Sequence, residues 1–420
     1  MIVRLCGLKD WCINMAEAIK IKKNLYYVGV SDSDIRTFDI IMKTANGTTY
    51  NAYLLKTSEG VILFDTVKQE FEDEFFEKIE SVCNYDEIKY IVMHHLEPDH
   101  SGALPELSKR CPNAKILISP MATPMLKAIT HNESMSFETV WTNKEFELGG
   151  YKLRFLSTPN LHWPETMSSV LINENILFSG DVFGSHYFDS RLFNDLVGDF
   201  DYAFKYYYEH IMRPFKSDVL NALKLYEKYE INTICNLHGP IIRENPQRYI
   251  ELYKEWSTKE VRLHGKKIIS IFYVTSYKNT KLLADALYEG IESNDLMIAN
   301  MYDMTALDEQ NMISILEEST GVLIGMPTIN SDAPKPVWDL LSCMMLLEKK
   351  GKFGGCFGSY GWSGEALEMV QSRLKALKFR VPLEPFKVKL VPTKQELSDA
   401  YYFGYEFSEI VNGKAMEMTL

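Results

Sequence analysis

The hydrophobic pattern is clearest after residue 265, where short apolar runs alternate with amphipathic stretches. Strand-like apolar runs occupy residues 268–274, 296–301, 322–326, 354–357 and 387–391. Helical patterns follow them at residues 280–293, 308–318, 334–349, 364–377 and 393–411. Strand–helix alternation with short connections predicts five βα units, with helices on both faces of a parallel sheet. The second part is therefore expected to be an α/β, doubly wound parallel sheet.

The first part opens with strand patterns instead. They fall at residues 24–30, 37–43, 50–56 and 61–65, and turn signals such as Asn46-Gly47 separate them. A helical pattern over residues 70–82 and a buried strand over 88–93 follow, and strands and helices then alternate to about residue 256. An early meander followed by alternating elements predicts an α+β sandwich of two sheets with helices outside.

The histidines mark the division between the two parts. All nine lie before residue 265, and none follows. The charged segment from Ser257 to Lys267 has the character of a linker and leads directly into an apolar strand. A length of 420 residues suits two domains. We therefore predict domains over residues 1–262 and 266–420.

Composition excludes several classes of protein. Hydrophobic residues make up 46% of the chain and charged residues 24%, which is a globular balance. The net charge of −12 argues against a nucleic-acid or anionic-membrane partner. No apolar run reaches the roughly 18 residues that span a bilayer, and Lys9 and Asp10 interrupt the N-terminal run before a secretory signal could form. The seven cysteines are scattered without a Cys-x-x-Cys pair, so a reducing cytoplasm is the expected location.

The densest set of candidate ligands directly follows the strand at 88–93. His95, Glu97, Asp99 and His100 fall within six residues. One helix face cannot hold all four side chains, so the pattern predicts a loop that curls around a bound group. A polar loop that caps a helix would account for Asp99 but not for the other three.

Three further candidate ligands lie where strands lead into loops. His162 precedes Trp-Pro in a loop, Asp181 ends a strand pattern, and His238 follows an apolar run. Each alone is typical of a turn, but together with the four residues above they predict one metal site. His94 and His186 flank these segments, and either orient the ligands or are structural histidines.

The order of these residues resembles that of the flavodiiron proteins, from about residue 20 to the C-terminus. The resemblance implies a metallo-β-lactamase-like αββα sandwich followed by a flavodoxin-like doubly wound sheet. It also implies two iron ions, one held by His95, Glu97 and His162, a second held by Asp99, His100 and His238, and Asp181 bridging both.

Ligand chemistry supports iron independently. Hydrolytic relatives of the same fold carry a histidine where Glu97 stands, and their nitrogen-rich sites hold zinc. A carboxylate in that place gives three carboxylates and four imidazoles. Anionic oxygen donors suit iron and stabilise its ferric state. Glu97 is therefore the most informative single residue in the sequence.

Three loops of the second part carry the features of a flavin site. Hydroxyl groups at a strand-to-helix turn can hold a phosphate together with free helix N–H groups, and aromatic faces stack on a flat ring. In a flavodoxin-like strand order such loops meet where FMN binds. The segments resemble the FMN loops of flavodiiron proteins, although Lys278 stands where flavodoxin loops often carry a glycine. The predicted FMN-binding residues are Thr275, Ser276, Tyr277, Lys278, Asn279, Thr280, Pro327, Thr328, Ile329, Asn330, Ser359, Tyr360, Gly361, Trp362, Ser363 and Gly364.

The resemblance implies an oxidoreductase in which reduced FMN feeds electrons to a non-haem diiron site. We expect reduction of O2 to water, with reduction of NO to N2O on the same site as the alternative. The chain shows no rubredoxin or flavin reductase extension, so a separate electron donor is expected: rubredoxin, ferredoxin, a flavin reductase or reduced deazaflavin. A homodimer or homotetramer is expected, because the family closes the gap between flavin and iron between subunits.

Two other function classes stay open at this point. One is a dizinc hydrolase that carries a flavodoxin module, and the other is an electron carrier or gas sensor with a structural metal. Two irons per chain with a yellow flavin favour the reductase, whereas two zincs with thioesterase or lactonase activity favour the hydrolase. Catalytic consumption of O2 or NO would exclude the carrier.

Overall fold

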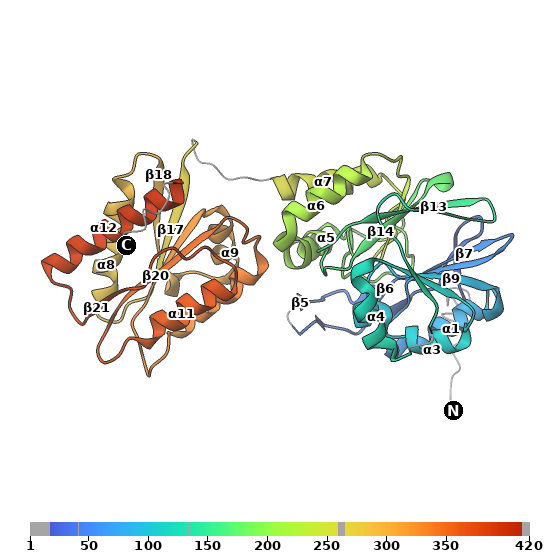
Figure 1. Cartoon of the computed structure of the whole chain (residues 1–420), viewed down its shortest axis with the longest axis horizontal. Coiled ribbons are helices and arrows are strands. Elements are labelled where there is room, and N and C mark those ends of the chain that lie inside the picture. The colour runs from blue at the N-terminus through green and yellow to red at the C-terminus, as the bar shows by residue number, and fades with distance from the viewer. Residues whose placement is uncertain (1–16, 41, 133–134, 259–264, 414–420) are drawn as a thin grey trace, which may run out of the picture. The chain divides into compact units, whose positions relative to one another are not determined.

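The structure is a computed structural model that describes residues 17–40, 42–132, 135–258 and 265–413. The chain divides after Thr258 into two compact units, which Figure 1 colours blue to yellow-green and golden to red. The predicted domain boundary between residues 262 and 266 falls partly on residues 259–264, outside the described ranges. In the described part, none of the helices combines the length and the apolar character that a bilayer crossing needs.

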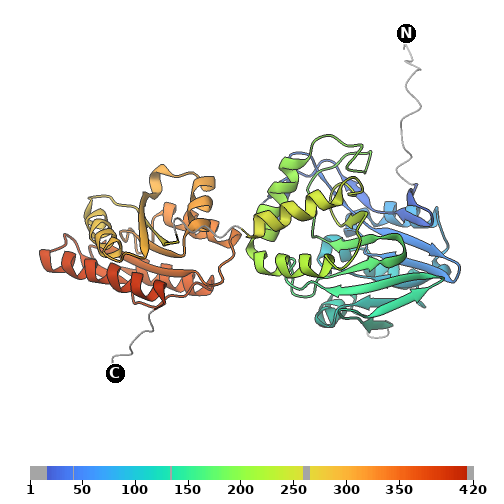
Figure 2. The same ribbon diagram turned by 90° about the horizontal axis from the view of Figure 1, so that it is seen from above.

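The first unit is built on two sheets that pack face to face (Figures 1 and 2). The first sheet contains, in spatial order, β1 (Ile19–Lys22), β2 (Leu25–Tyr27), β7 (Tyr53–Thr57), β8 (Gly60–Phe64), β9 (Ile88–Val92), β10 (Lys115–Ile118) and β11 (Phe137–Thr139). The second contains β12 (Glu145–Leu148), β13 (Tyr151–Ser157), β14 (Met167–Leu171), β15 (Ile176–Gly180) and β16 (Thr233–Asn236). Residues of both sheets share one buried cluster, in which the rings of Phe64 and Phe178 stack 4.0 Å apart.

Helices cover the outer faces of this sandwich (Figure 1). They are α1 (Glu72–Glu80), α2 (Pro98–Ser101), α3 (Leu104–Arg110), α4 (Thr123–Thr130), α5 (Asp201–Tyr207), α6 (Lys216–Tyr226) and α7 (Pro246–Thr258). Their buried aromatic and aliphatic side chains, such as Phe75 and Tyr253, form a second large cluster with the outer faces of the sheets. The predicted two-sheet sandwich with helices outside is therefore confirmed.

Two predicted strands of the meander are interrupted. Over residues 24–30, β2 ends and β3 (Val30–Asp32) begins a separate pair with β6 (Thr48–Tyr50). Gly29 lies at this break, where a Cβ atom would come within 2.5 Å of the carbonyl oxygen of Tyr50. Over residues 37–43, the prediction of one strand is wrong. Asp39 and Ile40 have φ values of 47° and 68° and form a turn between β4 (Thr37–Phe38) and β5 (Met42–Lys43).

The second unit contains the predicted parallel sheet. Its spatial order is β18 (Met297–Asp303), β17 (Lys267–Tyr273), β19 (Gly321–Gly325), β20 (Phe353–Tyr360) and β21 (Phe386–Lys389). Neighbouring strands all pair in parallel. Numbered along the sheet, this order is 2-1-3-4-5, the flavodoxin-like order, and it places the switch point between β17 and β19.

Helices lie on both faces of this sheet. They are α8 (Asn279–Glu292), α9 (Glu309–Glu318), α10 (Lys335–Cys343), α11 (Glu365–Ala376) and α12 (Lys394–Asn412). Side chains of α8 and α12 share one buried cluster with the sheet, and those of α9, α10 and α11 share another. The predicted helix over 334–349 ends at Cys343, because the chain tightens into a 3-10 turn over Met344–Leu346 that buries Met344 and leads to the buried Leu347.

Candidate metal centre and flavin site

The loop after β9 carries four of the seven predicted metal ligands. His95 and Glu97 lie in the extended chain beyond the strand, and Asp99 and His100 lie on α2. The predicted loop is thus a short extended stretch followed by one helical turn. The backbone N–H groups of His100 and Ser101 both donate to the carbonyl of Glu97 at 2.9 Å, and Pro98 suits the first helical position.

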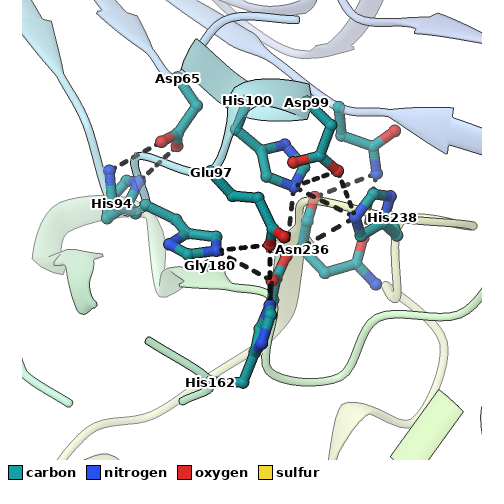
Figure 3. A network of polar contacts seen from close by, with 12 residues as sticks. Asp65, His94, Glu97, Asp99, His100, His162, Gly180, Asn236 and His238 are labelled. Atoms are coloured by element: carbon teal, nitrogen blue, oxygen red, sulfur yellow. Dashed lines mark hydrogen bonds and ion pairs between the residues drawn. The ribbon is translucent and has the colours of Figure 1, made fainter. Parts of the chain in front are cut away.

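The other three predicted ligands come from the second sheet. His162 lies in the loop between β13 and β14, Asp181 follows β15, and His238 follows β16. Figure 3 shows the side chains of His162 and His238 pointing toward those of the loop after β9. The structure therefore brings all seven side chains together at the ends of strands from both sheets.

The ligand atoms form two neighbouring groups. In the first, Glu97 Oε2 lies 3.1 Å from His95 Nε2 and 2.9 Å from His162 Nε2. In the second, Asp99 Oδ2 lies 3.2 Å from both His100 Nε2 and His238 Nε2. Apart from Asp181, which also lies within the first group, the two groups are the triplets that the resemblance implies.

Asp181 lies between the two groups. Its Oδ2 is 3.2 Å from His162 Nε2 and 3.6 Å from His95 Nε2. Its Oδ1 is 3.4 Å from His100 Nε2 and 3.8 Å from His238 Nε2. Each oxygen of one buried carboxylate therefore faces a different group, as a bridging ligand would.

These side chains fit a pair of metal ions. Two donors that each lie about 2.1 Å from one ion are about 3.0 Å apart at a right angle and about 3.4 Å apart at a tetrahedral angle. The distances above fall mainly in this range. Both carboxylate oxygens of Asp99, together with Oδ1 of Asp181, are buried without a hydrogen-bond partner among the described residues. Buried anionic oxygens without a donor are costly, and metal ions would satisfy them.

The histidines keep the carboxylates anionic. Burial raises the pKa of Asp181, but contacts with His100 and His162 outweigh it and hold that pKa well below its usual range. The pKa of Glu97 is likewise lowered against burial, by His162 and His95. Conversely, burial lowers the pKa of His162, whereas Asp181 and Glu97 raise it, to about 9. Glu97 and Asp181 are therefore held in the anionic form that a metal ligand requires.

Sequence reasoning missed the hydrogen-bond partners of two predicted ligands, His95 and His238. The Nδ1–H of His95 donates to Glu165 Oε1 at 2.7 Å, and Glu165 is 2% exposed. On the opposite side of the site, His238 Nδ1–H donates to the carbonyl of Thr49 at 2.7 Å. The only signal for Glu165 in the sequence is its place three residues after His162, because its contact depends on how this loop folds against the loop after β9.

The two flanking histidines have different surroundings. His94 is fixed by Asp65 Oδ2 at 2.6 Å and by Ser169 Oγ at 2.7 Å (Figure 3 shows the Asp65 contact), so it anchors the chain just before His95. His186 Nδ1 lies 2.9 Å from Thr48 Oγ1, whose oxygen is also 3.4 Å from His238 Nδ1. His186 is thereby linked to a predicted ligand, while His94 supports the backbone.

The predicted flavin loops lie at neighbouring strand ends of the second unit. Residues 275–280 follow β17 and enter α8, residues 327–330 follow β19, and residues 359–364 lie at the end of β20 and lead into α11. The hydroxyl of Thr328 is buried without a hydrogen-bond partner in the described part, whereas Ser359 donates to the carbonyl of Leu390 at 2.9 Å. The three loops therefore meet beside the switch point of the sheet.

Apolar side chains are unusually exposed in these loops. Tyr277 is 87% exposed, Trp362 is 95% exposed and Ile329 is 47% exposed. Lys278 has a φ of 67°, which explains why glycine is common at this position in flavodoxin loops. Exposed aromatic side chains, in loops that also carry an unpaired hydroxyl, suit an aromatic ring with a polar rim.

Two family models match the chain, one for each unit. The model of the ODP family beta lactamase matches residues 48–239, and the flavodoxin model matches residues 271–404. The type A flavoprotein of Rhodobacter capsulatus is 42% identical over 401 residues, which cover 94% of this chain and 92% of that protein. A flavo-diiron protein of Clostridium acetobutylicum is 38% identical over 406 residues, which cover 94% of this chain and all of that protein. The chain belongs to the flavodiiron protein family.

Two other relatives of this flavodiiron protein have names that state a reaction. The anaerobic nitric oxide reductase flavorubredoxin of Enterobacter sp. (strain 638) is 33% identical over 398 residues, covering 93% of this chain and 81% of that protein. The solved structure of rubredoxin oxygen:oxidoreductase from Desulfovibrio gigas has a TM-score of 0.66 and 30% identity, and the match covers 94% of this chain and 99% of that one.

Membership of the family confirms the predicted fold class and cofactors. The first unit is metallo-β-lactamase-like and the second is flavodoxin-like. Flavodiiron proteins are oxidoreductases with FMN and a non-haem diiron site. The two ligand groups of the first unit and the exposed loops of the second are the places in this chain that fit these cofactors.

Proposed function

We propose that this flavodiiron protein reduces O2 to water at an iron pair in its first unit, with FMN in its second unit as the source of electrons. The observation that carries the proposal is the position of Glu97, whose carboxylate lies within 3.1 Å of two histidines of one ligand group. An anionic oxygen at this place suits iron better than a third imidazole would.

The seven side chains form two sets of metal ligands with one shared member. His95, Glu97 and His162 would hold one ion, Asp99, His100 and His238 would hold the second, and Asp181 would be a ligand of both. When bound, the iron pair and the flavin supply one-electron redox chemistry that amino-acid side chains lack. The ligand side chains lie at the ends of two sheets, where rigid strands and outer contacts such as that of Glu165 with His95 would hold them in place around the pair.

The second unit would hold FMN at the three exposed loops. The hydroxyls and the backbone N–H groups over residues 275–280 lie at the N-terminus of α8 and would receive the phosphate. Tyr277, Ile329 and Trp362 offer exposed apolar faces for the ring system. The buried hydroxyl of Thr328 has no protein partner among the described residues and is available to a polar edge of the ring.

The proposal includes partners and a compartment. An external donor reduces the flavin, and rubredoxin heads the candidates because a relative is named rubredoxin oxygen:oxidoreductase. Ferredoxin, a flavin reductase and reduced deazaflavin are the others. The active assembly is a homodimer or a homotetramer. Five cysteines in the described part are buried and outside any disulfide, which suits a reducing compartment such as the cytoplasm.

Reduction of NO to N2O is the second candidate function. It is favoured by the 33% identity with the anaerobic nitric oxide reductase flavorubredoxin. The same ligand set would serve both gases, so the ligands themselves do not decide between them.

Consumption of each gas by the reduced protein tests the proposal. Protein loaded with iron and FMN is reduced anaerobically and mixed with O2 or NO, and gas uptake is followed with electrodes. We expect faster turnover with O2, and its loss together with most of the iron in Asp181→Ala. His131→Asn is the matched control, because His131 is exposed and has a φ of 48° that asparagine tolerates. Faster turnover with NO would select the second function, and full iron content in Asp181→Ala would contradict the ligand assignment.

A further inference from the structure

Glu165 is a buried carboxylate outside the seven predicted ligands. It lies between β13 and β14 and is 2% exposed. Its Oε1 accepts two hydrogen bonds, from His95 Nδ1 at 2.7 Å and from the backbone N–H of Leu96 at 3.1 Å. Its Oε2 is buried without a partner in the described part of the chain. The backbone carbonyl of Glu165 accepts a hydrogen bond from Ser119 Oγ at 2.6 Å.

The other ligand group has no equivalent carboxylate behind its histidines in the described residues. His238 Nδ1 donates to a neutral carbonyl, that of Thr49. His100 Nδ1 is buried without a hydrogen-bond partner among the described residues. Glu97 contributes one negative charge to the first group and Asp99 contributes one to the second, and the charge of Asp181 is shared by both groups. The group around His95 therefore has one more negative charge close to it than the group around His238.

We propose that Glu165 is a positioning residue that acts through His95 and makes the two iron positions electronically unequal. This inference rests on the proposed iron pair. A carboxylate that accepts the Nδ1–H of an imidazole fixes its tautomer and makes its Nε2 a stronger donor. Burial keeps water from screening the charge. Glu165 therefore stabilises the more oxidised state of the ion on the His95 side and lowers the reduction potential of that position.

The hydrogen bonds of Glu165 allow its charge to be separated from its geometry. Both bonds go to Oε1, and Oε2 has none. In Glu165→Gln the amide oxygen can take the place of Oε1 and keep both bonds, so the variant removes the charge and preserves the position of His95. Glu165→Ala removes both the charge and the bonds.

A redox titration of the loaded protein tests the inference. The potential of the iron pair is followed by its EPR signal, and the potential of FMN is followed by absorbance in the same sample. In Glu165→Gln we expect one of the two iron potentials to rise while the FMN potential stays unchanged. Glu165→Ala should in addition bind one of the two ions about 10–100-fold more weakly in competition with a chelator, using ferrous iron as the probe.

Ser119→Ala is the matched control. It removes the hydrogen bond to the backbone of Glu165 and leaves the carboxylate in place. Its iron potentials should equal those of the unmodified protein. A rise in Ser119→Ala as large as that in Glu165→Gln would overturn the inference, because disturbance of the loop would then explain the effect.

The remaining outcomes separate the inference from the function on which it rests. The inference alone fails if the unmodified protein binds two irons and consumes gas, but Glu165→Gln has the same iron reduction potentials as the unmodified protein. If the unmodified protein binds no iron pair, the proposed function fails and the inference fails with it.

Discussion

At the scale of single residues, the choice of metal depends on Glu97. Glu97→His should lower the ratio of bound iron to bound zinc by at least about tenfold when the protein is loaded from equal concentrations of both metals. This is a lower bound, because loss of an outer hydrogen-bond partner alone changes metal affinity about 10–100-fold. The physical reason is that the change gives one ligand group a third nitrogen donor in place of an anionic oxygen. Metal analysis of the purified variant measures the ratio. A ratio unchanged from the original protein would show that Glu97 does not select the metal.

The site also shows which functional residues can be predicted from the sequence and which cannot. All seven predicted ligands lie together in the structure. They could be predicted because their residue types and their positions at the ends of strand patterns can be recognised in the sequence. Glu165 was not predicted, because its contact with His95 depends on the fold of two distant loops. Lys278 departs from the usual glycine, and only its φ of 67° explains why glycine is common there.

At the scale of single elements, the start of α12 offers a measurable contribution to stability. Thr393 Oγ1 accepts from the N–H of Glu396 at 3.2 Å, and Glu396 Oε2 accepts from the N–H of Thr393 at 2.8 Å. Thr393→Ala should lower the free energy of unfolding of the second unit by about 1 kcal/mol, because the N–H of Glu396 loses its side-chain partner at the helix end. Denaturant unfolding followed by flavin fluorescence measures the change. Thr393→Ser keeps the cap and should behave like the original; an equal loss in Thr393→Ser would contradict this explanation.

The flavin loops predict a second effect at this scale. Trp362→Ala should weaken FMN binding by about 1 kcal/mol, or about fivefold in Kd, because a stacked aromatic contact is lost. Quenching of FMN fluorescence during titration of the flavin-free protein gives the Kd. Trp141→Ala removes an exposed tryptophan of the first unit, 55% exposed, and serves as the control. Equal Kd values for Trp362→Ala and Trp141→Ala would show that Trp362 does not touch the ring.

Element boundaries were harder to predict than element types. The βα alternation of the second part predicted its strands and helices closely, because the three central strands β17, β19 and β20 are buried between two helical layers. The meander of the first part was less predictable. The turn at Asp39 and Ile40 contains no glycine or proline, so the pattern over residues 37–43 predicts one continuous strand.

At the scale of the whole molecule, the two units have separate cores and separate cofactors. Calorimetry should therefore show two unfolding transitions. Removal of FMN should lower the midpoint of one, and removal of iron by a chelator should lower the midpoint of the other, because each ligand stabilises only the unit that binds it. A single transition that shifts equally on both treatments would show that the units unfold together.

The most direct test of the iron pair is a crystal structure of the iron-loaded protein with anomalous scattering measured at the iron and zinc absorption edges. The account predicts two iron peaks, with a carboxylate oxygen of Glu97 about 2.0–2.2 Å from one of them and an oxygen of Asp181 bound to each. Peaks that appear only at the zinc edge, or a Glu97 carboxylate beyond bonding distance of both ions, would contradict it.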